Sequence, residues 1–316
     1  MLKRSLNFII AAALLIAICT YLGWGKPSKI VGMFVVSGMA VGSLYALGGI
    51  GLVVLYRATG VLNLSNGAIG ALGVMLAWQL QQWQLPEVST WVIGIATTTA
   101  LALFYGRLIA PGLAWRDPVV KAVATLGYAL IVLGLTAFLW EDDVRKFALP
   151  SDKIAYMFMG MRVTLTRIIV VLAAIGIVIA VWAYLSKTRT GLNMRALADN
   201  RDISALIGIP IVKTETIAWG ISGLIAGFTG LMFGDLVRLE PFVITFMVIP
   251  AISAAICGQL KNLGVVLFAG ICIGIIESML TMNPVLKSVR PMAPFVIAIL
   301  VLVWTQRGRM NYFSGN

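Results

Sequence analysis

The sequence predicts an all-α protein, a polytopic transmembrane bundle of about ten helices. Three observations predict it. Hydrophobic residues make up 60% of the 316 residues and charged residues only 11%, whereas a soluble domain is about 45–50% apolar. The apolar residues form runs long enough for a helix of about 20 residues, the length that crosses a bilayer. Charges, Pro or Trp bound these runs, as they do at the ends of membrane helices.

The first predicted helix, over 8–20, follows Lys3 and Arg4 and resembles the start of a secretory signal peptide. No small-x-small cleavage site follows, so we expect an extra N-terminal transmembrane helix within residues 1–30. Together the helices are expected to form a single transmembrane domain over 1–316. The other crossings are expected at 31–56, 62–82, 91–110, 121–140, 164–185, 214–237, 241–258, 263–281 and 293–305.

The formal net charge of +12 comes from Lys and Arg residues scattered singly between apolar runs. Such scatter favours contact with anionic lipid headgroups over nucleic acid, and it supplies topology signals. An even number of crossings with the N-terminus inside predicts that both termini are cytoplasmic. Residues 187–213 then also lie in the cytoplasm, and the acidic segment 141–143 lies outside.

The sequence offers no residues for common catalytic or metal chemistry. It contains no His, and its three cysteines, Cys19, Cys257 and Cys272, lie in apolar runs without C-x-x-C spacing. No G-x-x-x-x-G-K-S/T loop is present for binding ATP, and no G-x-S-x-G or H-E-x-x-H motif is present for hydrolysis. We therefore expect neither a metal, a cofactor nor a catalytic site in this chain.

Glycines recur inside the apolar runs at the small-x-x-x-small spacing. This spacing lets two helices approach closely in lipid, because no side chain separates their backbones. It predicts close helix packing at Gly38 and Gly42, at Gly223 and Gly227, and at Gly270 and Gly274.

A polar, glycine-containing segment over 56–67 interrupts the apolar pattern between two strongly apolar runs. Non-helical backbone at membrane depth is tolerated where it is buried in protein or lines a watery cavity, and transporters use such breaks to contact substrates. One hypothesis is a broken or re-entrant helix whose Asn63, Ser65 and Asn66 line a pathway. The alternative is a cytoplasmic turn after Arg57, followed by a helix capped by Asn or Ser.

Residues 186–210 form a long hydrophilic loop with helical character. The spacing of Leu192, Ala196 and Ile203 predicts one or two short amphipathic helices, closed by Gly208 and Pro210. Such a surface can bind a soluble partner, whereas the alternative is a solvated loop on the lipid headgroups.

Ionisable residues also fall in or beside the late helices, at Asp235, Arg238 and Glu277. A charge as deep in an apolar run as Glu277 is costly and usually faces the bundle interior. No second carboxylate lies near it in sequence to form a proton relay, so we expect Glu277 to make a structural hydrogen bond between helices.

Four segments, in order over 35–305, resemble the Liv-type branched-chain amino acid permeases of ABC importers. The matching residues are Met39 to Leu47 with Gly51, Leu52, Tyr56, Thr59 to Val61, Asn63 and Gly67; Thr125 to Gly127; Thr188 to Gly191 with Arg195, Ala196, Ala205, Leu206, Gly208 and Ile209; and Gly258 to Gly264 with Gly270, Gly274 and Glu277. The chain departs from the family at Leu64 to Gly67, where F-A-H-G is usual, and at Cys257 to Asn262, where G-G-x-G-S is common. These departures leave open whether the substrate is a branched-chain or other amino acid, urea or an amide, or an aromatic acid.

The resemblance implies the permease subunit of an ATP-driven importer in the bacterial inner membrane. A second, homologous permease subunit would complete the pathway, two cytoplasmic ATPases would bind ATP and Mg, and a periplasmic or lipid-anchored protein would deliver the substrate. A stand-alone secondary transporter or channel is the first alternative, and a membrane enzyme is the second. The expected pathway residues are Tyr45, Thr59, Gly60, Asn63, Ser65, Asn66, Gly67, Thr125 and Gly127. The residues expected to couple the permease to the ATPase are Arg195, Ala198, Asp199, Asp202, Ala205, Leu206 and Gly208.

Overall fold

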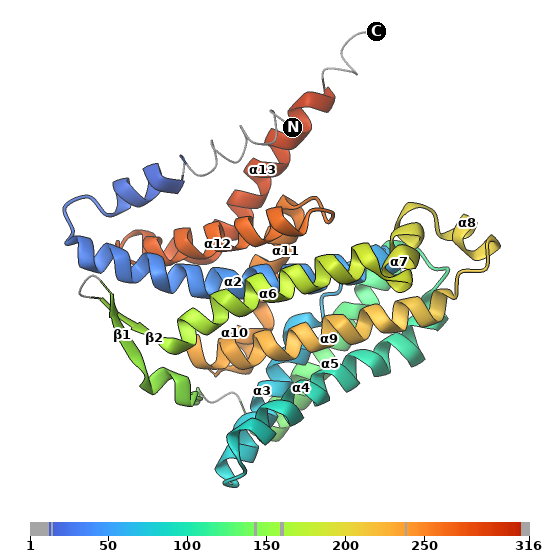
Figure 1. Cartoon of the computed structure of the whole chain (residues 1–316), viewed down its shortest axis with the longest axis horizontal. Helices are drawn as coiled ribbons and strands as arrows, with labels where there is room; N and C mark the ends of the chain where they lie inside the picture. The colour runs from blue at the N-terminus through green and yellow to red at the C-terminus, as the bar shows by residue number, and fades with distance from the viewer. Residues whose placement is uncertain (1–12, 14, 142–143, 159–160, 238, 311–316) are drawn as a thin grey trace.

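Long apolar helices form the body of the molecule, as the sequence predicts (Figure 1). The computed structural model describes residues 13, 15–141, 144–158, 161–237 and 239–310. Within these residues, seven helical segments are long and apolar enough to cross a membrane. They are α2 (Ser28–Thr59), α4 with its continuation (Glu87–Leu113), α5 (Pro118–Trp140), α6 (Leu165–Lys187), α9 (Ile211–Leu236), α12 (Leu263–Leu280) and the segment Leu286–Val303.

Two predicted crossings are shorter or broken. The crossing expected at 62–82 is α3 (Asn66–Gln82), which begins later because residues 60–65 are not helical. The crossing expected at 241–258 consists of α10 (Pro241–Phe246) and α11 (Val248–Cys257), which join at Met247. The crossing expected at 293–305 is α13 (Ala293–Met310), preceded by the 3-10 helix η4 (Leu286–Met292). Only part of the expected first helix lies within the described residues, where 15–22 are helical.

The predicted glycine pairs lie at close helix contacts. A Cβ atom built on Gly42 of α2 would lie 2.6 Å from the Gly270 carbonyl oxygen of α12, and one on Gly38 would lie 2.7 Å from the Gly274 oxygen. On α9, a Cβ at Gly223 would lie 3.0 Å from the Cα of Thr99 in α4 (Glu87–Phe104). The two backbones therefore touch at these positions, and any side chain would separate them.

Helix α4 changes its winding before it ends. It continues into a π-helical turn, η1 (Tyr105–Ile109), and then a 3-10 turn, η2 (Ala110–Leu113). The π-helical turn places Gly106 against the indole of Trp219 in α9, with only 2.6 Å between a built Cβ and the ring. Single π-helical turns of this kind often occur at functional sites.

The segment between α5 and α6 contains a β-hairpin that the sequence analysis did not predict. Strand β1 (Ala155–Phe158) pairs antiparallel with β2 (Met161–Thr164), and the 3-10 helix η3 (Pro150–Lys153) precedes them. Strands of four residues are too short to give a clear alternation of apolar and polar residues. The all-α prediction otherwise holds for the described residues.

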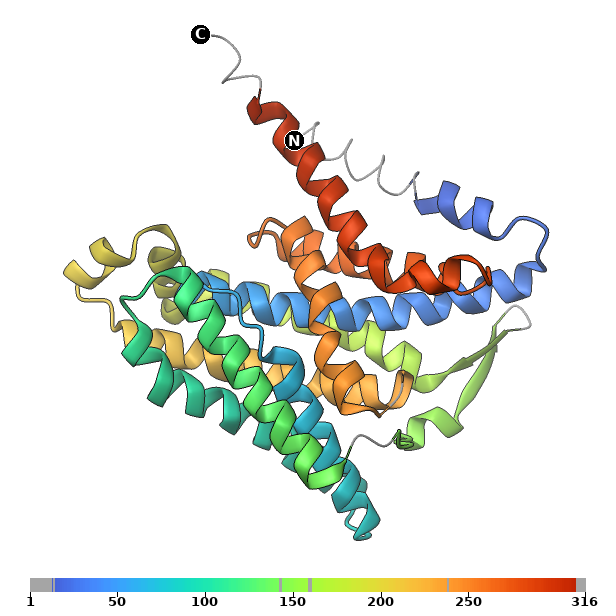
Figure 2. The ribbon, with the colours of Figure 1, turned by 180° about the vertical axis from the view of Figure 1, so that it is seen from behind.

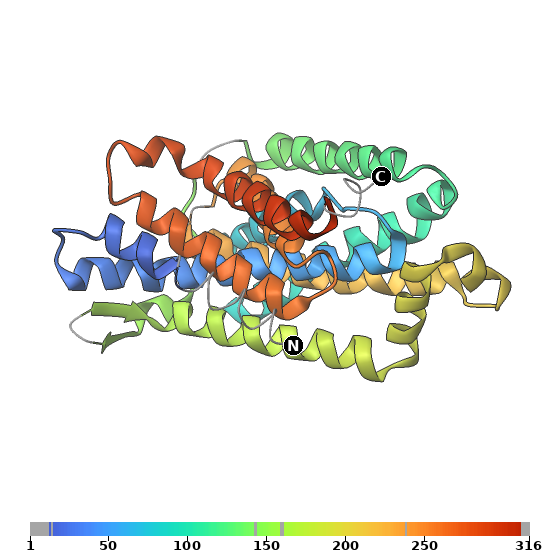
Figure 3. The same ribbon diagram turned by 90° about the horizontal axis from the view of Figure 1, so that it is seen from above.

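The hairpin and the short helices α7 (Arg189–Asp199) and α8 (Arg201–Leu206) lie at opposite ends of the bundle (Figures 1 and 3). Between these ends, α2, α6 and α9 run along the length of the molecule. Figure 2 shows α5, α10, α11 and α13 on the face turned away in Figure 1. This separation of ends agrees with the predicted topology, in which 141–164 and 187–213 face opposite sides of the membrane.

Candidate functional site

The break between α2 and α3 begins at Gly60. This residue has a left-handed backbone, with φ of 73°, and its N–H donates to the Tyr56 carbonyl at 2.8 Å. Glycine adopts this conformation without steric cost, so α2 ends here. The following Asn63 and Ser65 are buried, with 1% and 0% of their surface exposed. The segment is thus enclosed by protein, which agrees with the broken-helix hypothesis.

Asn63 holds the break in shape through a local turn. Its Oδ1 accepts from the Ser65 N–H at 2.9 Å and from the Ser65 hydroxyl at 2.6 Å. Thr125 of α5 reaches the same segment, because its hydroxyl donates to the Leu62 carbonyl at 3.3 Å and accepts from the Leu64 N–H at 3.2 Å. Ser65 makes no capping bond to α3, so the alternative in which Ser65 caps a new helix lacks its expected contact.

A small cavity of about 30 Å³ lies beside the break. This is room for about two water molecules and far too little for an amino acid. Of the predicted pathway residues, Thr59, Asn63 and Thr125 line it. The other lining residues are Leu55, Val61, Tyr105, Ala110, Leu113, Ala114, Lys121, Arg201, Glu215 and Trp219.

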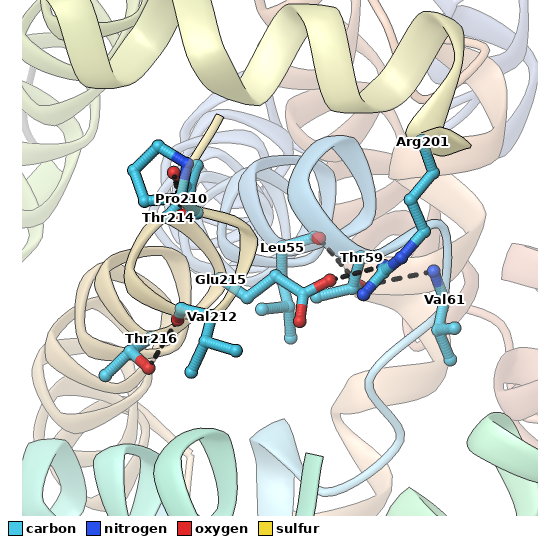
Figure 4. Close-up of polar contacts among 9 residues, drawn as sticks. All are labelled: Leu55, Thr59, Val61, Arg201, Pro210, Val212, Thr214, Glu215 and Thr216. Carbon is cyan, nitrogen blue, oxygen red and sulfur yellow. Dashed lines mark hydrogen bonds and ion pairs between the residues drawn. The ribbon is translucent and has the colours of Figure 1, made fainter. Parts of the chain in front are cut away.

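Three ionisable side chains meet at this cavity. Arg201, the first residue of α8, donates to the Glu215 carboxylate of α9 at 2.5 Å, and Lys121 lies in the first turn of α5. Figure 4 shows the Arg201 and Glu215 side chains pointing toward one another beside Thr59 and Val61. Glu215 is 3% exposed, so its charge needs the nearby cation for stabilisation. The Arg201 guanidinium also lies 5.5 Å from the centre of the Trp115 ring.

Sequence reasoning missed this charged cluster. Glu215 lies near the start of α9, beside Lys213 and Thr214, where a charge is typical of the end of an apolar run and gave no separate signal. Its partner Arg201 lies fourteen positions earlier, in the loop, so no helical spacing connected the two residues.

Asn66 and Gly67 line a second cavity, of about 20 Å³, between α2, α3, α9, α10 and α11. The Ser222 hydroxyl donates to Asn66 Oδ1 at 3.4 Å. A Cβ on Gly67 would lie 2.2 Å from the Thr245 carbonyl oxygen, so α3 and α10 touch here. Of the nine predicted pathway residues, three therefore line the first cavity and two line the second.

Four predicted pathway residues line neither cavity: Gly60 and Ser65 in the break itself, Tyr45 on α2 and Gly127 on α5. The hydroxyl of Tyr45 in α2 donates to Glu277 of α12 at 2.6 Å, and its ring packs against Phe233 at 5.8 Å. This is the interhelical hydrogen bond expected for Glu277. Gly127 of α5 is exposed, and an added Cβ there would meet nothing within 4 Å.

Helices α7 and α8 confirm the predicted pair of short amphipathic helices. Thr188 caps α7 by accepting from the Gly191 N–H at 3.0 Å, and Asn200 caps α8 by accepting from the Ile203 N–H at 3.0 Å. Gly208 ends the pair with φ of 82°. The buried Met194 and Leu197 fix α7 to the bundle. All seven predicted coupling residues are exposed: Arg195, Ala198, Asp199, Asp202, Ala205, Leu206 and Gly208.

The chain matches a known family of transport proteins. A family model described as "Branched-chain amino acid transport system / permease component" matches residues 34–304. The chain belongs to this family. Its described residues contain seven candidate membrane spans, so it is a multi-pass membrane protein. As a permease component it is a transport protein and not itself an enzyme.

Relatives in this family cover most of the chain. A probable branched-chain amino acid transport permease protein LivH of Methanocaldococcus jannaschii is 26% identical over 76% of this chain and 78% of that protein. The high-affinity branched-chain amino acid permease LivH of Escherichia coli is 23% identical over 84% of this chain and 91% of that protein. Among solved structures, PsaBC from Streptococcus pneumoniae in complex with Fab covers 92% of this chain and 95% of that chain, with 14% identity and a TM-score of 0.45.

Proposed function

We propose that this permease is the translocation subunit of an ATP-driven ABC importer for branched-chain amino acids or a related small polar substrate. The family match and the names of the relatives support this proposal over a stand-alone transporter or channel. The proposal places the chain in a bacterial inner membrane with both termini in the cytoplasm. ATP and Mg would bind to partner ATPases, because the sequence has no phosphate-binding loop.

The observation that carries the coupling part of the proposal is the exposed apolar tip of α8. Leu206 is 87% exposed, Ile207 69% and Ile203 56%, outside any candidate membrane span. Clustered exposed apolar residues mark sites that bind another protein. The tip protrudes at one end of the bundle, where a cytoplasmic ATPase could reach it (Figure 1).

This tip is connected to the transmembrane helices by specific contacts. The ion pair from Arg201 to Glu215 joins α8 to α9, and the Thr188 cap joins α7 to the end of α6. An ATPase that moves on nucleotide binding can therefore move α9 through α8. These contacts support α7 and α8 as the coupling surface.

The remaining partners would occupy other surfaces. A second permease subunit could cover the exposed apolar face of α5, where Phe138 is 85% exposed and Ile131 is 69% exposed. Lipid would cover the rest of the apolar surface. A substrate-binding protein would contact the opposite end from α8, where the hairpin presents Met157, which is 78% exposed.

Reconstitution tests the proposed function directly. The permease is co-expressed with its genomic neighbours, the complex is purified, and uptake of radiolabelled leucine into proteoliposomes is measured. We expect uptake that needs the ATPase subunits and enclosed ATP. Equal uptake by the permease alone would contradict the proposal and support a stand-alone transporter.

The coupling surface is tested by Ala205→Glu. A large charged side chain at this exposed position should weaken ATPase binding by about 10- to 100-fold, which corresponds to about 1.4–2.8 kcal/mol. Binding of detergent-purified permease to the isolated ATPase measures the effect. Met157→Glu, a charge placed on the exposed hairpin at the other end, should leave ATPase binding unchanged. Normal ATPase binding by Ala205→Glu would show that α8 is not the coupling surface.

A further inference from the structure

The cavity beside the break carries an excess of positive charge. Two cations, Arg201 and Lys121, and one carboxylate, Glu215, line it, so one positive charge is unmatched. The three residues come from α8, α5 and α9. Because little water fits in this space, the unmatched charge is weakly solvated and favours an anion.

Three hydrogen-bond donor groups of the residues that line the cavity have no acceptor among the described residues. Glu215 accepts a hydrogen bond from Nη1 of Arg201. Nε and Nη2 of Arg201 are buried and donate to no group among the described residues. The indole Nε1 of Trp219 is likewise buried without a partner in the described part of the chain. A guanidinium presents its donors as a planar fork that matches a carboxylate. A carboxylate or another oxyanion could therefore accept hydrogen bonds from these free donors.

Much of the remaining cavity lining is apolar. The Tyr105 ring packs against Trp219 with 4.5 Å between ring centres, and Leu55 and Leu113 complete this wall. A ligand with a carboxylate at one end and a short aliphatic chain at the other would place its chain against these residues. Branched-chain amino acids have this shape.

We propose that this cavity is a binding site for the carboxylate of the substrate, with Arg201 and Lys121 as its cations and Glu215 as an internal competitor. The inference rests on the proposed function for the identity of the substrate as an amino acid. In this structure Glu215 is the ion-pair partner of Arg201. A substrate carboxylate replaces Glu215 on the guanidinium, and the substrate ammonium can then pair with Glu215.

The size of the cavity connects this site to coupling. About 30 Å³ holds only water, so the site must widen before a substrate binds. Arg201 is the first residue of α8, and a shift of α8 therefore moves the guanidinium away from Glu215. Binding at this site therefore requires that α8 has moved, and a carboxylate that binds there stabilises the moved state even in the isolated chain.

The competing explanation is that Arg201 and Glu215 only fasten α8 to α9. The two explanations differ for Glu215→Gln. If Glu215 competes with the ligand for Arg201, its loss strengthens carboxylate binding. If the ion pair only holds α8 against α9, its loss loosens the cavity and weakens carboxylate binding. The variant therefore separates a binding site from a structural contact.

The test uses the full chain with Cys19, Cys257 and Cys272 replaced by alanine and a single cysteine at Ala114, in the cavity wall. The rate of alkylation by a neutral maleimide is measured with three probes. These are 4-methylpentanoate, which is leucine without its ammonium; 3-methylbutylamine, which is leucine without its carboxylate; and sodium chloride at equal ionic strength. We expect 4-methylpentanoate to slow the reaction and the amine to leave it unchanged.

Variants then identify the residues that bind 4-methylpentanoate. Glu215→Gln should raise the apparent affinity for 4-methylpentanoate by about tenfold, the gain from removing a charge-assisted competing bond. Lys121→Gln, which leaves the ion pair intact, should lower the affinity, and Arg201→Gln with Glu215→Gln should abolish protection. Lys213→Gln removes an exposed cation of the same helix and serves as the matched control with wild-type protection.

Three results would overturn the proposal. The amine could protect as well as the acid, Glu215→Gln could weaken protection, or chloride could protect as well as 4-methylpentanoate, which would make the cavity a site for inorganic anions only. Leucine uptake by the complete complex is measured separately. Failure of the carboxylate site with normal uptake would leave the proposed function intact, whereas absent uptake with normal protection would contradict the function alone.

Discussion

Two helix contacts in this permease show opposite ways of joining elements in a membrane. Where α2 meets α12, glycine backbones touch, and the buried hydrogen bond from Tyr45 to Glu277 joins the two helices nearby. Where α8 meets α9, the ion pair of Arg201 and Glu215 stands beside a cavity with free donors. The first contact has no space for rearrangement, and the second has an exchangeable partner.

The difference between these two contacts indicates which helices can move relative to one another. Separating α2 from α12 would lose close backbone packing along several turns and remove the Tyr45 hydrogen bond from a buried carboxylate. Separating α8 from α9 needs only another anion for Arg201 and another cation for Glu215. We therefore expect α2 and α12 to behave as a fixed frame, while α8 transmits motion.

Gly42→Leu should have the largest effect, because it breaks the fixed frame. The new side chain would begin 2.6 Å from the Gly270 carbonyl oxygen, where only backbone displacement could make room. We expect destabilisation of at least about 3 kcal/mol, the upper end of the usual cost of overpacking, and little folded protein. Thermal unfolding of the detergent-purified chain measures it.

Gly176→Leu is the matched control for this prediction. Gly176 of α6 is exposed and would meet nothing within 4 Å, so its unfolding midpoint should stay close to that of the wild type. Equal loss of stability in both variants would show that the glycine contact between α2 and α12 is not special.

Tyr45→Phe should have an intermediate effect. It removes the Tyr45 hydrogen bond from the buried Glu277 carboxylate, which costs about 1–3 kcal/mol. Glu277→Gln keeps an acceptor for the Tyr45 hydroxyl and should cost less than Tyr45→Phe. Differential thermal unfolding compares the two variants.

Transport by Glu277→Gln checks the structural role of this residue. The variant should transport with a normal pH profile when its membrane level is normal. Lost transport together with a shifted pH profile would instead identify Glu277 as a proton carrier.

The smallest effect is expected from cysteine labelling. It tests whether the break at Asn63 and Ser65, beside the cavity of Arg201 and Glu215, can be reached from water. Asn63→Cys faces the cavity and should react with a water-soluble maleimide, whereas Ser65→Cys, which is fully buried and lines neither cavity, should react several-fold more slowly. Rates are compared with and without the ATPase and nucleotide. Equal, nucleotide-independent rates at both positions would remove the break from the pathway.

Local patterns predicted the parts of the fold that depend on short stretches of sequence. The apolar runs predicted the long helices, and the small-x-x-x-small spacing predicted which residues would touch, because both patterns follow the helical repeat. The spacing over 186–210 likewise predicted α7 and α8, which end at Gly208. The hairpin over 155–164 gave no usable signal, since its strands are only four residues long.

Sequence patterns thus predicted the membrane class, the long helices and the exposed short helices α7 and α8 of this permease. Only the tertiary structure decided that Arg201 meets Glu215, that Lys121 joins them, and that Tyr45 pairs with Glu277 instead of lining a cavity. The physical reason is distance along the chain. A helical repeat relates residues a few positions apart, whereas Tyr45 and Glu277 are 232 positions apart and meet only because the glycine contacts bring α2 and α12 together.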